Sequence, residues 1–180
     1  AKGDEDADWD TDDEATGILE SALTKVGSAT RNIIVKENRK PLLPVVFESA
    51  HPYADSLDLL GSVSIPGAVS LVLVFDAQCA MEQGADWLRI YYDQEKTRQA
   101  HPDKLSGGYQ GRAGGNFPGT NGLPPLVIES DTFWHYFHSD SSVHDWGYKA
   151  TVYPSFEKGG KDVIDKMLGE AQAIKNRKRL

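Results

Sequence analysis

Apolar and polar residues alternate in short runs through the middle of the chain, which is the pattern of β-strands. In the run 68–76, alternate residues from Val69 to Phe75 share one apolar face, and Val72 and Val74 make the opposite face apolar as well. A strand that is apolar on both faces is typical of the centre of a sheet. Strands are expected at 45–49, 60–65, 68–76, 86–92, 125–129, 132–139 and 145–153.

Short strands separated by turn residues favour an all-β sandwich or barrel over alternating strands and helices. The stretch 132–153 is central to this prediction, because it joins an aromatic β-rich run, a short polar loop and a second β-rich run. We expect these two runs to pair as a hairpin and the segment 44–154 to form a β-sandwich around it.

The pattern changes on both sides of the predicted sandwich. Residues 1–16 form an acidic, low-complexity lead, and residues 17–43 combine a short amphipathic helix with a short β-prone strand. In 155–180, apolar residues recur at three- and four-residue spacing from about Lys161, which predicts a C-terminal amphipathic helix. Its apolar stripe needs a covering surface on the sandwich, on the first helix or on a neighbouring domain.

Charge and composition exclude several classes of function. The net charge of −8 comes almost entirely from residues 1–16, which carry eight acids and one base, so the remaining residues sum to −1. With no basic stripe and no nucleic-acid motif in the body, we expect no nucleic-acid binding. The longest apolar run, 68–75, is too short to span a bilayer, so no transmembrane segment is expected. Cys79 is the only cysteine, which excludes an internal disulfide and favours the cytoplasm or the nucleus.

The usual catalytic motifs are missing as well. The chain has no Gly-x-Ser-x-Gly elbow, and Ser139 beside Asp140 lacks a convincing base. His135 and His138 are separated by an odd number of residues in a predicted strand, so they point to opposite faces and cannot readily share a metal. We therefore expect no enzymatic activity.

Acidic residues stand at the ends of the predicted strands. Asp76 closes the 68–76 run, Asp86 opens the 86–92 run, and Glu82 lies between them. If these two strands pair antiparallel, both aspartates lie at one end of their hairpin.

The later strands repeat this arrangement. Asp140 closes one run and Asp145 opens the next. In a sandwich, all five acids can gather at one rim, where their like charges require a cation. Hard oxygen ligands suit calcium, and Ser142 or a backbone carbonyl can complete the shell. Aspartate is also common at strand ends simply because it forms turns, so both interpretations stay open.

Two further features concern partners. Trp146, His144 and Tyr53 lie near the same predicted rim and are candidates for contact with a partner. The Gly-rich insert 93–124 has no phosphate-loop ending. A long loop of this kind serves either binding or mere variation in length, and the sequence leaves both alternatives open.

Three blocks in the body resemble a CUB domain, and together they cover about residues 47–153. Residues 48–53 (Glu-Ser-Ala-His-Pro-Tyr) are similar to the Ser-Pro-x-Tyr-Pro opening of that family. Residues 86–90 (Asp-Trp-Leu-Arg-Ile) match its Asp-x-Leu-x-Ile strand. Residues 138–142 (His-Ser-Asp-Ser-Ser) and 147–150 (Gly-Tyr-Lys-Ala) resemble its closing Ser-Asp-x-Ser and Gly-Phe-x-Ala motifs.

The resemblance implies a mainly β fold, an antiparallel sandwich of jelly-roll type, here flanked by N- and C-terminal helices. In calcium-binding members, one acid from the preceding loop and two aspartates form the cation site. The two aspartates correspond to Asp86 and Asp140, and the third position is assigned to Asp76, with Glu82 as second choice. Because cysteines are missing, the chain looks more like the cysteine-poor CUB-like modules of very large intracellular proteins, some of them ubiquitin ligases or ZZ-type zinc-finger proteins.

We therefore expect a non-catalytic protein-interaction or scaffolding module of a large intracellular protein, with Ca²⁺ at one loop rim. Its partner is a protein or a neighbouring domain of the same chain. An alternative is a calcium-dependent β-sandwich that binds a lipid headgroup or a glycan. A third alternative is a purely architectural spacer.

Overall fold

The computed structural model of the chain describes residues 42–108 and 114–178. The acidic lead and the helix and strand predicted before Pro41 therefore lie outside the described residues.

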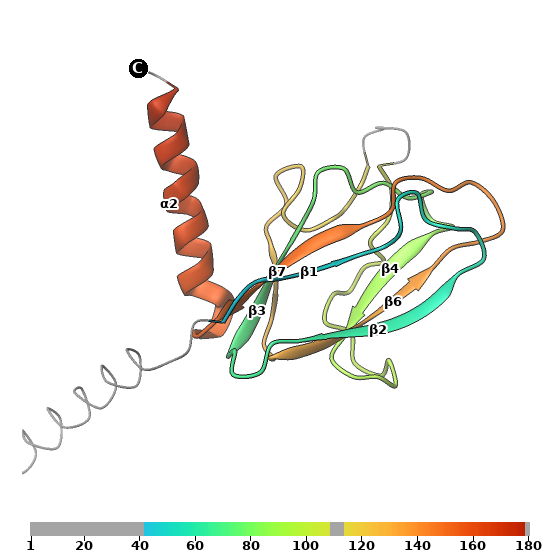
Figure 1. The fold of residues 1–180 in the computed structure, drawn as a ribbon, viewed down its shortest axis with the longest axis horizontal. Coiled ribbons are helices and arrows are strands. Elements are labelled where there is room, and N and C mark those ends of the chain that lie inside the picture. Colours follow the sequence, from blue (N-terminus) through green and yellow to red (C-terminus); the bar gives the residue numbers. More distant parts are fainter. Residues whose placement is uncertain (1–41, 109–113, 179–180) are drawn as a thin grey trace, which may run out of the picture. The chain divides into compact units, whose positions relative to one another are not determined.

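The described residues form two antiparallel sheets followed by a helix (Figure 1). One sheet has the strand order β1-β7-β3-β5 and the other has the order β2-β6-β4. The mainly β sandwich with a C-terminal helix is thus confirmed, and the expected strands are present with ends shifted by a few residues. The strands are β1 (Val45–Glu48), β2 (Asp58–Ser64), β3 (Ser70–Phe75), β4 (Trp87–Tyr91), β5 (Leu126–Ile128), β6 (Thr132–His138) and β7 (Lys149–Ser155).

The doubly apolar pattern of the 68–76 run reflects the central position of β3. This strand pairs with β7 on one side and with β5 on the other. Leu71, Val72 and Leu73 are completely buried, because the sandwich core covers one face and other parts of the chain cover the second face. One of these parts is Gly160, where an added Cβ would lie 2.3 Å from Val72 Cγ2.

The predicted hairpin across 132–153 is wrong. Strand β6 pairs with β2 and β4, whereas β7 pairs with β1 and β3, so the two strands belong to different sheets. Strands β3 and β4, which were expected to pair, are also in different sheets. The loops between them cross from one layer to the other, which alternation within a single strand cannot reveal.

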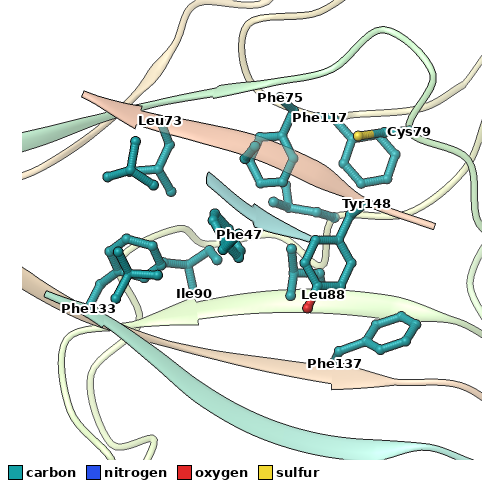
Figure 2. Close-up of a cluster of buried hydrophobic side chains, with 14 of the residues drawn as sticks. Phe47, Leu73, Phe75, Cys79, Leu88, Ile90, Phe117, Phe133, Phe137 and Tyr148 are labelled. Carbon is teal, nitrogen blue, oxygen red and sulfur yellow. The ribbon is translucent and has the colours of Figure 1, made fainter. Parts of the chain in front are cut away.

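The core lies between the sheets and is rich in aromatic rings. Figure 2 shows Phe47 of β1 in the middle of this core, between side chains of both layers. Its ring packs at centroid distances of 5.5 Å from Phe133 and 5.6 Å from Tyr148. Ring pairs at such separations add to the stability that burial alone provides.

The Gly-rich insert is partly structural. Leu105 and Phe117 are buried in the core, with exposed fractions of 0% and 1%. Residues 98–105 also run along the outer edge of β4 and form backbone hydrogen bonds with it, including a reciprocal pair between Leu88 and Leu105 of 2.9 and 2.8 Å. The insert therefore completes the sandwich, although residues 109–113 within it are outside the described part.

The chain ends in a short 3₁₀ turn, η2 (Lys158–Gly160), and the helix α2 (Lys161–Arg177). The start of α2 is fixed by Asp162, whose carboxylate accepts hydrogen bonds from Ser155 Oγ and from the backbone N–H of Phe156. No residue of α2 is buried, and Leu168 and Ile174 are 64% and 55% exposed. Within the described residues, the apolar stripe is thus partly covered at its start, where Val163, Ile164 and Met167 are half-buried, and is uncovered farther along. In this part of the chain, no helix has both the length and the apolar character that crossing a membrane requires.

Candidate functional site

Antiparallel pairing brings three acidic residues together at one end of the three-stranded sheet. Strand β4 begins opposite the end of β6, with Trp87 paired to His138. Asp86 directly precedes β4, Glu82 lies in the loop before it, and Asp140 follows β6. One carboxylate oxygen from each of the three acids lies within 4.8 Å of the others.

Asp86 is the centre of this acidic cluster, defined as Glu82, Asp86 and Asp140. Its side chain is completely buried. Oδ2 accepts a hydrogen bond of 2.5 Å from the hydroxyl of Tyr53, and Oδ1 accepts one of 2.8 Å from the backbone N–H of Asp140. Asp86 therefore fixes the loop after β6 and the segment before β2 to the start of β4.

Glu82 is the unsatisfied member of the cluster. Its Oε2 atom is buried and has no hydrogen-bond partner among the described residues. Burial, followed by the negative charges of Asp140 and Asp86, raises the pKa of the Glu82 carboxyl. A buried carboxylate without a partner is costly, so this position favours either a proton or a cation.

No protein cation neutralises the cluster within the described part of the chain. The ion pairs there involve other acids, namely Glu48, Asp55, Asp58 and Asp165. The side chains that meet at the cluster offer oxygen atoms only, without imidazole or thiolate. Such a ligand set fits a hard cation such as calcium and does not fit zinc.

Ser142, predicted as an auxiliary ligand, lies beside the cluster. Its backbone N–H donates to Asp140 Oδ1 at 2.9 Å, and its hydroxyl lies 3.5 Å from the same oxygen. This turn orients the Asp140 carboxylate. It also places the hydroxyl of Ser142 beside the Asp140 carboxylate.

Two of the predicted ligands are not part of the cluster. Asp76 and Asp145 are absent from the group of acids that could hold one ion. Both instead line a separate pocket of about 630 Å³, together with Trp146. Asp76 Oδ1 accepts from the N–H of Gln78, and Asp145 Oδ1 accepts from the N–H of Trp146. Glu82, the second choice for the third position, lies with Asp86 and Asp140, whereas Asp76, the first choice, lines the separate pocket.

The predicted partner-binding residues have different environments. Tyr53 is only 1% exposed, so it cannot meet a partner and belongs to the interior beside Asp86. Burial and then the bond to Asp86 raise the pKa of its hydroxyl, which therefore stays protonated as a donor. Trp146 is partly buried and stacks on His51 at 3.9 Å. The side chain of His144 is 51% exposed and lies 3.1 Å from Asp55, so this residue is accessible.

Sequence reasoning missed Ser106, which organises the loop that carries two of the acids. Its hydroxyl lies 3.0 Å from the carbonyl of Glu82 and 2.7 Å from that of Asp86, and it accepts a bond of 3.1 Å from the N–H of Gly84. An isolated serine in a Gly-rich insert gives no sequence signal for this role.

Replacing Ser106 by alanine is expected to lower the free energy of unfolding by about 1–3 kcal/mol, because buried backbone groups lose their partner. Chemical denaturation measures this change. Ser62→Ala is the matched control, because Ser62 is exposed on β2 and a change within about 0.5 kcal/mol is expected there. Equal effects of the two substitutions would contradict the role assigned to Ser106.

Comparison with known proteins relates the chain to segments of very large proteins. No protein-family model matches it. It is 35% identical over 148 residues to the E3 ubiquitin-protein ligase HERC2 of Mus musculus, and 35% identical over 143 residues to HERC2 of Homo sapiens. It is also 31% identical over 132 residues to the zinc finger ZZ-type and EF-hand domain-containing protein 1 of Homo sapiens.

These alignments cover 82%, 79% and 72% of the chain, but the chain spans only 3–4% of the length of these relatives. The predicted kinship with large multidomain proteins, a ubiquitin ligase and a ZZ-type zinc-finger protein among them, is confirmed. Among solved structures, the crystal structure of the MASP-1 CUB2 domain bound to Ca²⁺ is similar, with a TM-score of 0.43 and 15% identity. That similarity covers 61% of this chain and 90% of the CUB2 chain.

Proposed function

We propose that this chain, homologous to segments of two large multidomain proteins, is a non-catalytic protein-interaction module with a calcium ion at its loop rim. The observation that carries the proposal is the buried Oε2 of Glu82, which has no partner among the described residues and lies beside two further carboxylates. A divalent cation would supply the missing partner and offset the repulsion within the cluster.

The three acids would act as the protein ligands of the ion. Glu82 and Asp86 belong to the loop that leads into β4, whereas Asp140 belongs to the loop that follows β6. A shared ion would join these loops and stiffen the rim of the sandwich. Ordered loops lower the conformational entropy that binding a partner costs. The accessible His144 lies in the same loop as Asp140 and would meet such a partner directly.

The surroundings of Ser139, the nucleophile considered in the sequence, support a non-catalytic role. Ser139 is 2% exposed, and its hydroxyl donates to the carbonyl of Ala54 while accepting from the N–H of Leu57. The neighbouring His138 pairs with Asp58 instead. Ser139 therefore joins the loop after β6 to the segment before β2, and no described residue is placed as a base to activate it. We place the module in the cytoplasm or the nucleus, in keeping with its single cysteine, Cys79.

Calorimetric titration with calcium tests the proposal. The wild-type chain is expected to bind calcium with a Kd of roughly 10⁻⁷–10⁻⁵ M, the range of intracellular sensor sites. Asp140→Ala and Glu82→Gln are expected to weaken binding by at least about tenfold, because each removes a charged ligand. Asp76→Asn is the matched control, since Asp76 lines the neighbouring pocket. The calcium affinity of this variant should match that of the wild type.

The absence of heat at millimolar calcium would remove the ion from the proposed function. Weaker binding in Asp76→Asn would instead place the ion in the neighbouring pocket. Calcium-dependent binding to anionic vesicles or to a glycan array, lost in Asp140→Ala, would favour the lipid- or glycan-binding alternative over a protein partner.

A further inference from the structure

Among the described residues, strand β2 is an edge strand that has a neighbour on one side only. It pairs only with β6 and lies at the margin of the three-stranded sheet (Figure 1). Just outside the strand, the N–H of Ile65 bonds to the carbonyl of Asp131, and the N–H of Ser139 bonds to that of Leu57. In an antiparallel ladder, the residues that bond to the neighbour alternate with residues that face away.

This alternation identifies the free groups. Odd-numbered positions from Leu57 to Ile65 direct their N–H and C=O groups toward β6. The even-numbered positions between them direct theirs away from the sheet, and among the described residues no other strand pairs with β2. The residues with free backbone groups are Asp58, Leu60, Ser62 and Ser64.

The opposite edge of the same sheet, strand β4, is hydrogen-bonded to another segment of the chain. Strand β4 is covered by the chain itself, since Ala100 donates to Ile90 at 2.9 Å and Leu105 exchanges hydrogen bonds with Leu88. In the described part of the chain, the backbone is thus hydrogen-bonded at one edge of this sheet and unpaired at the other.

Apart from the charge of Asp58 at one end, strand β2 also lacks the residues that normally protect an open edge. It is seven residues long and contains no proline and no lysine. Leu59 and Leu60 are 50% and 42% exposed and point to opposite faces of the sheet. A strand added at this edge would cover apolar surface on both faces while it pairs with the free backbone groups.

Asp58 places a negative charge at one end of the edge, which favours a basic residue on an added strand. Its side chain is 61% exposed, and both Tyr136 and His138 bond to the same oxygen, Oδ1. The Tyr136 bond, followed by the His138 bond, lowers the pKa of the Asp58 carboxyl, so this group is ionised near neutral pH. Its second oxygen can accept from a cation on an added strand.

We propose that β2 is a docking site for an extended segment of a partner protein, which pairs with it as a further strand. The segment has apolar residues at alternate positions, one of them beside Leu60, and a basic residue beside Asp58. Main-chain hydrogen bonds supply affinity in this mode of recognition, and the alternate side chains supply specificity. The site involves none of the three acids of the cluster, so it stands independently of the proposed calcium ion.

A synthetic peptide of alternating valine and threonine, with lysine at both ends, tests the proposal on the full chain. Binding is followed by the NMR amide shifts of the protein. The largest changes are expected at the four residues with free backbone groups. The same peptide with every backbone amide N-methylated cannot form the ladder, and no binding of it is expected.

Three variants of the protein sharpen the test. Ser62→Pro removes only an N–H that faces away from β6, and proline is tolerated on edge strands. It is expected to weaken peptide binding by at least about tenfold, because the ring also blocks close approach. Ser62→Ala keeps the N–H and should bind like the wild type. Leu60→Lys, at a position 42% exposed, is a second blocking variant that leaves the core unchanged.

Several outcomes would overturn the proposal. These are no peptide binding at millimolar concentration, shifts confined to other strands, or equal binding of the N-methylated peptide. Self-association of the chain that Ser62→Pro abolishes would assign the edge to a second copy instead of a partner segment. Unchanged thermal unfolding of the variants checks that the fold is intact.

Discussion

Replacing Phe47 by alanine is expected to lower the free energy of unfolding by about 3–5 kcal/mol, the usual cost of removing a large buried aromatic side chain. Phe47 is 8% exposed although it belongs to the short edge strand β1. Its ring contacts Phe75 of the same sheet at a centroid distance of 6.1 Å, and Phe133 and His135 of the opposite sheet at 5.5 and 5.0 Å. The substitution would leave a cavity where the two layers meet (Figure 2).

Denaturant unfolding, followed by tryptophan fluorescence, measures this effect. The matched control is Val46→Ala on the same strand, where the side chain is 49% exposed on the outer face. A loss below about 1 kcal/mol is expected for the control. A similarly small loss for Phe47→Ala would show that the core does not depend on this ring and would contradict the packing described.

Acid is expected to destabilise the fold through His135. This histidine lies among the core rings, and its Nδ1 is buried with no partner in the described part of the chain. A Cβ at Gly61 would lie only 2.5 Å from its Nε2. Burial lowers the pKa of His135 from 6.5 to about 4, so the folded chain keeps the ring neutral.

The direction of the effect follows from proton binding. Between the two pKa values the unfolded chain binds the proton and the folded chain does not, so stability is complete above about pH 6.5 and is lost as the pH falls toward 4. The full loss is about 3 kcal/mol, and about 2 kcal/mol of it is expected between pH 7 and pH 5. The raised pKa of Glu82 acts in the opposite direction, since the folded chain binds that proton more readily.

Comparison with His135→Leu isolates the contribution of this histidine. The leucine variant cannot titrate, so its free energy of unfolding should fall less between pH 7 and pH 5 than that of the wild type, by about 2 kcal/mol. Parallel pH profiles for the two proteins would rule out the buried neutral histidine as the cause. The exposed His144 gives a control. His144→Gln, introduced into both proteins, should leave unchanged the difference between wild type and His135→Leu in the fall of the free energy of unfolding.

The strands could be predicted from the sequence because each depends on its own pattern. Alternation located β6, and the doubly apolar run located the central strand β3. The sheet to which each strand belongs could not be predicted in this way. An apolar face looks the same in either layer, so only the folded chain shows that β6 and β7 lie in different sheets.

The sequence also indicated part of the acidic cluster, namely the two aspartates at strand ends. Asp86 and Asp140 meet because β4 and β6 pair antiparallel, and both stood at recognisable strand ends. Glu82 and not Asp76 lies beside these two aspartates, and the loop that carries Glu82 joins strands of different sheets. The role of Tyr53 inside the site depends on a contact across 33 positions of sequence, which no local pattern encodes.

The anchoring of α2 at one end only has a consequence for its dynamics. The first turn is fixed through Asp162, whereas no side chain farther along is buried. Helices of this length are marginally stable in water when nothing packs against them. Amide hydrogen exchange is therefore expected to quicken steadily toward Arg177. If another surface packs on Leu168 and Ile174, amide exchange in the final turns should slow. The exchange rates of those amides therefore report whether α2 is packed against another surface.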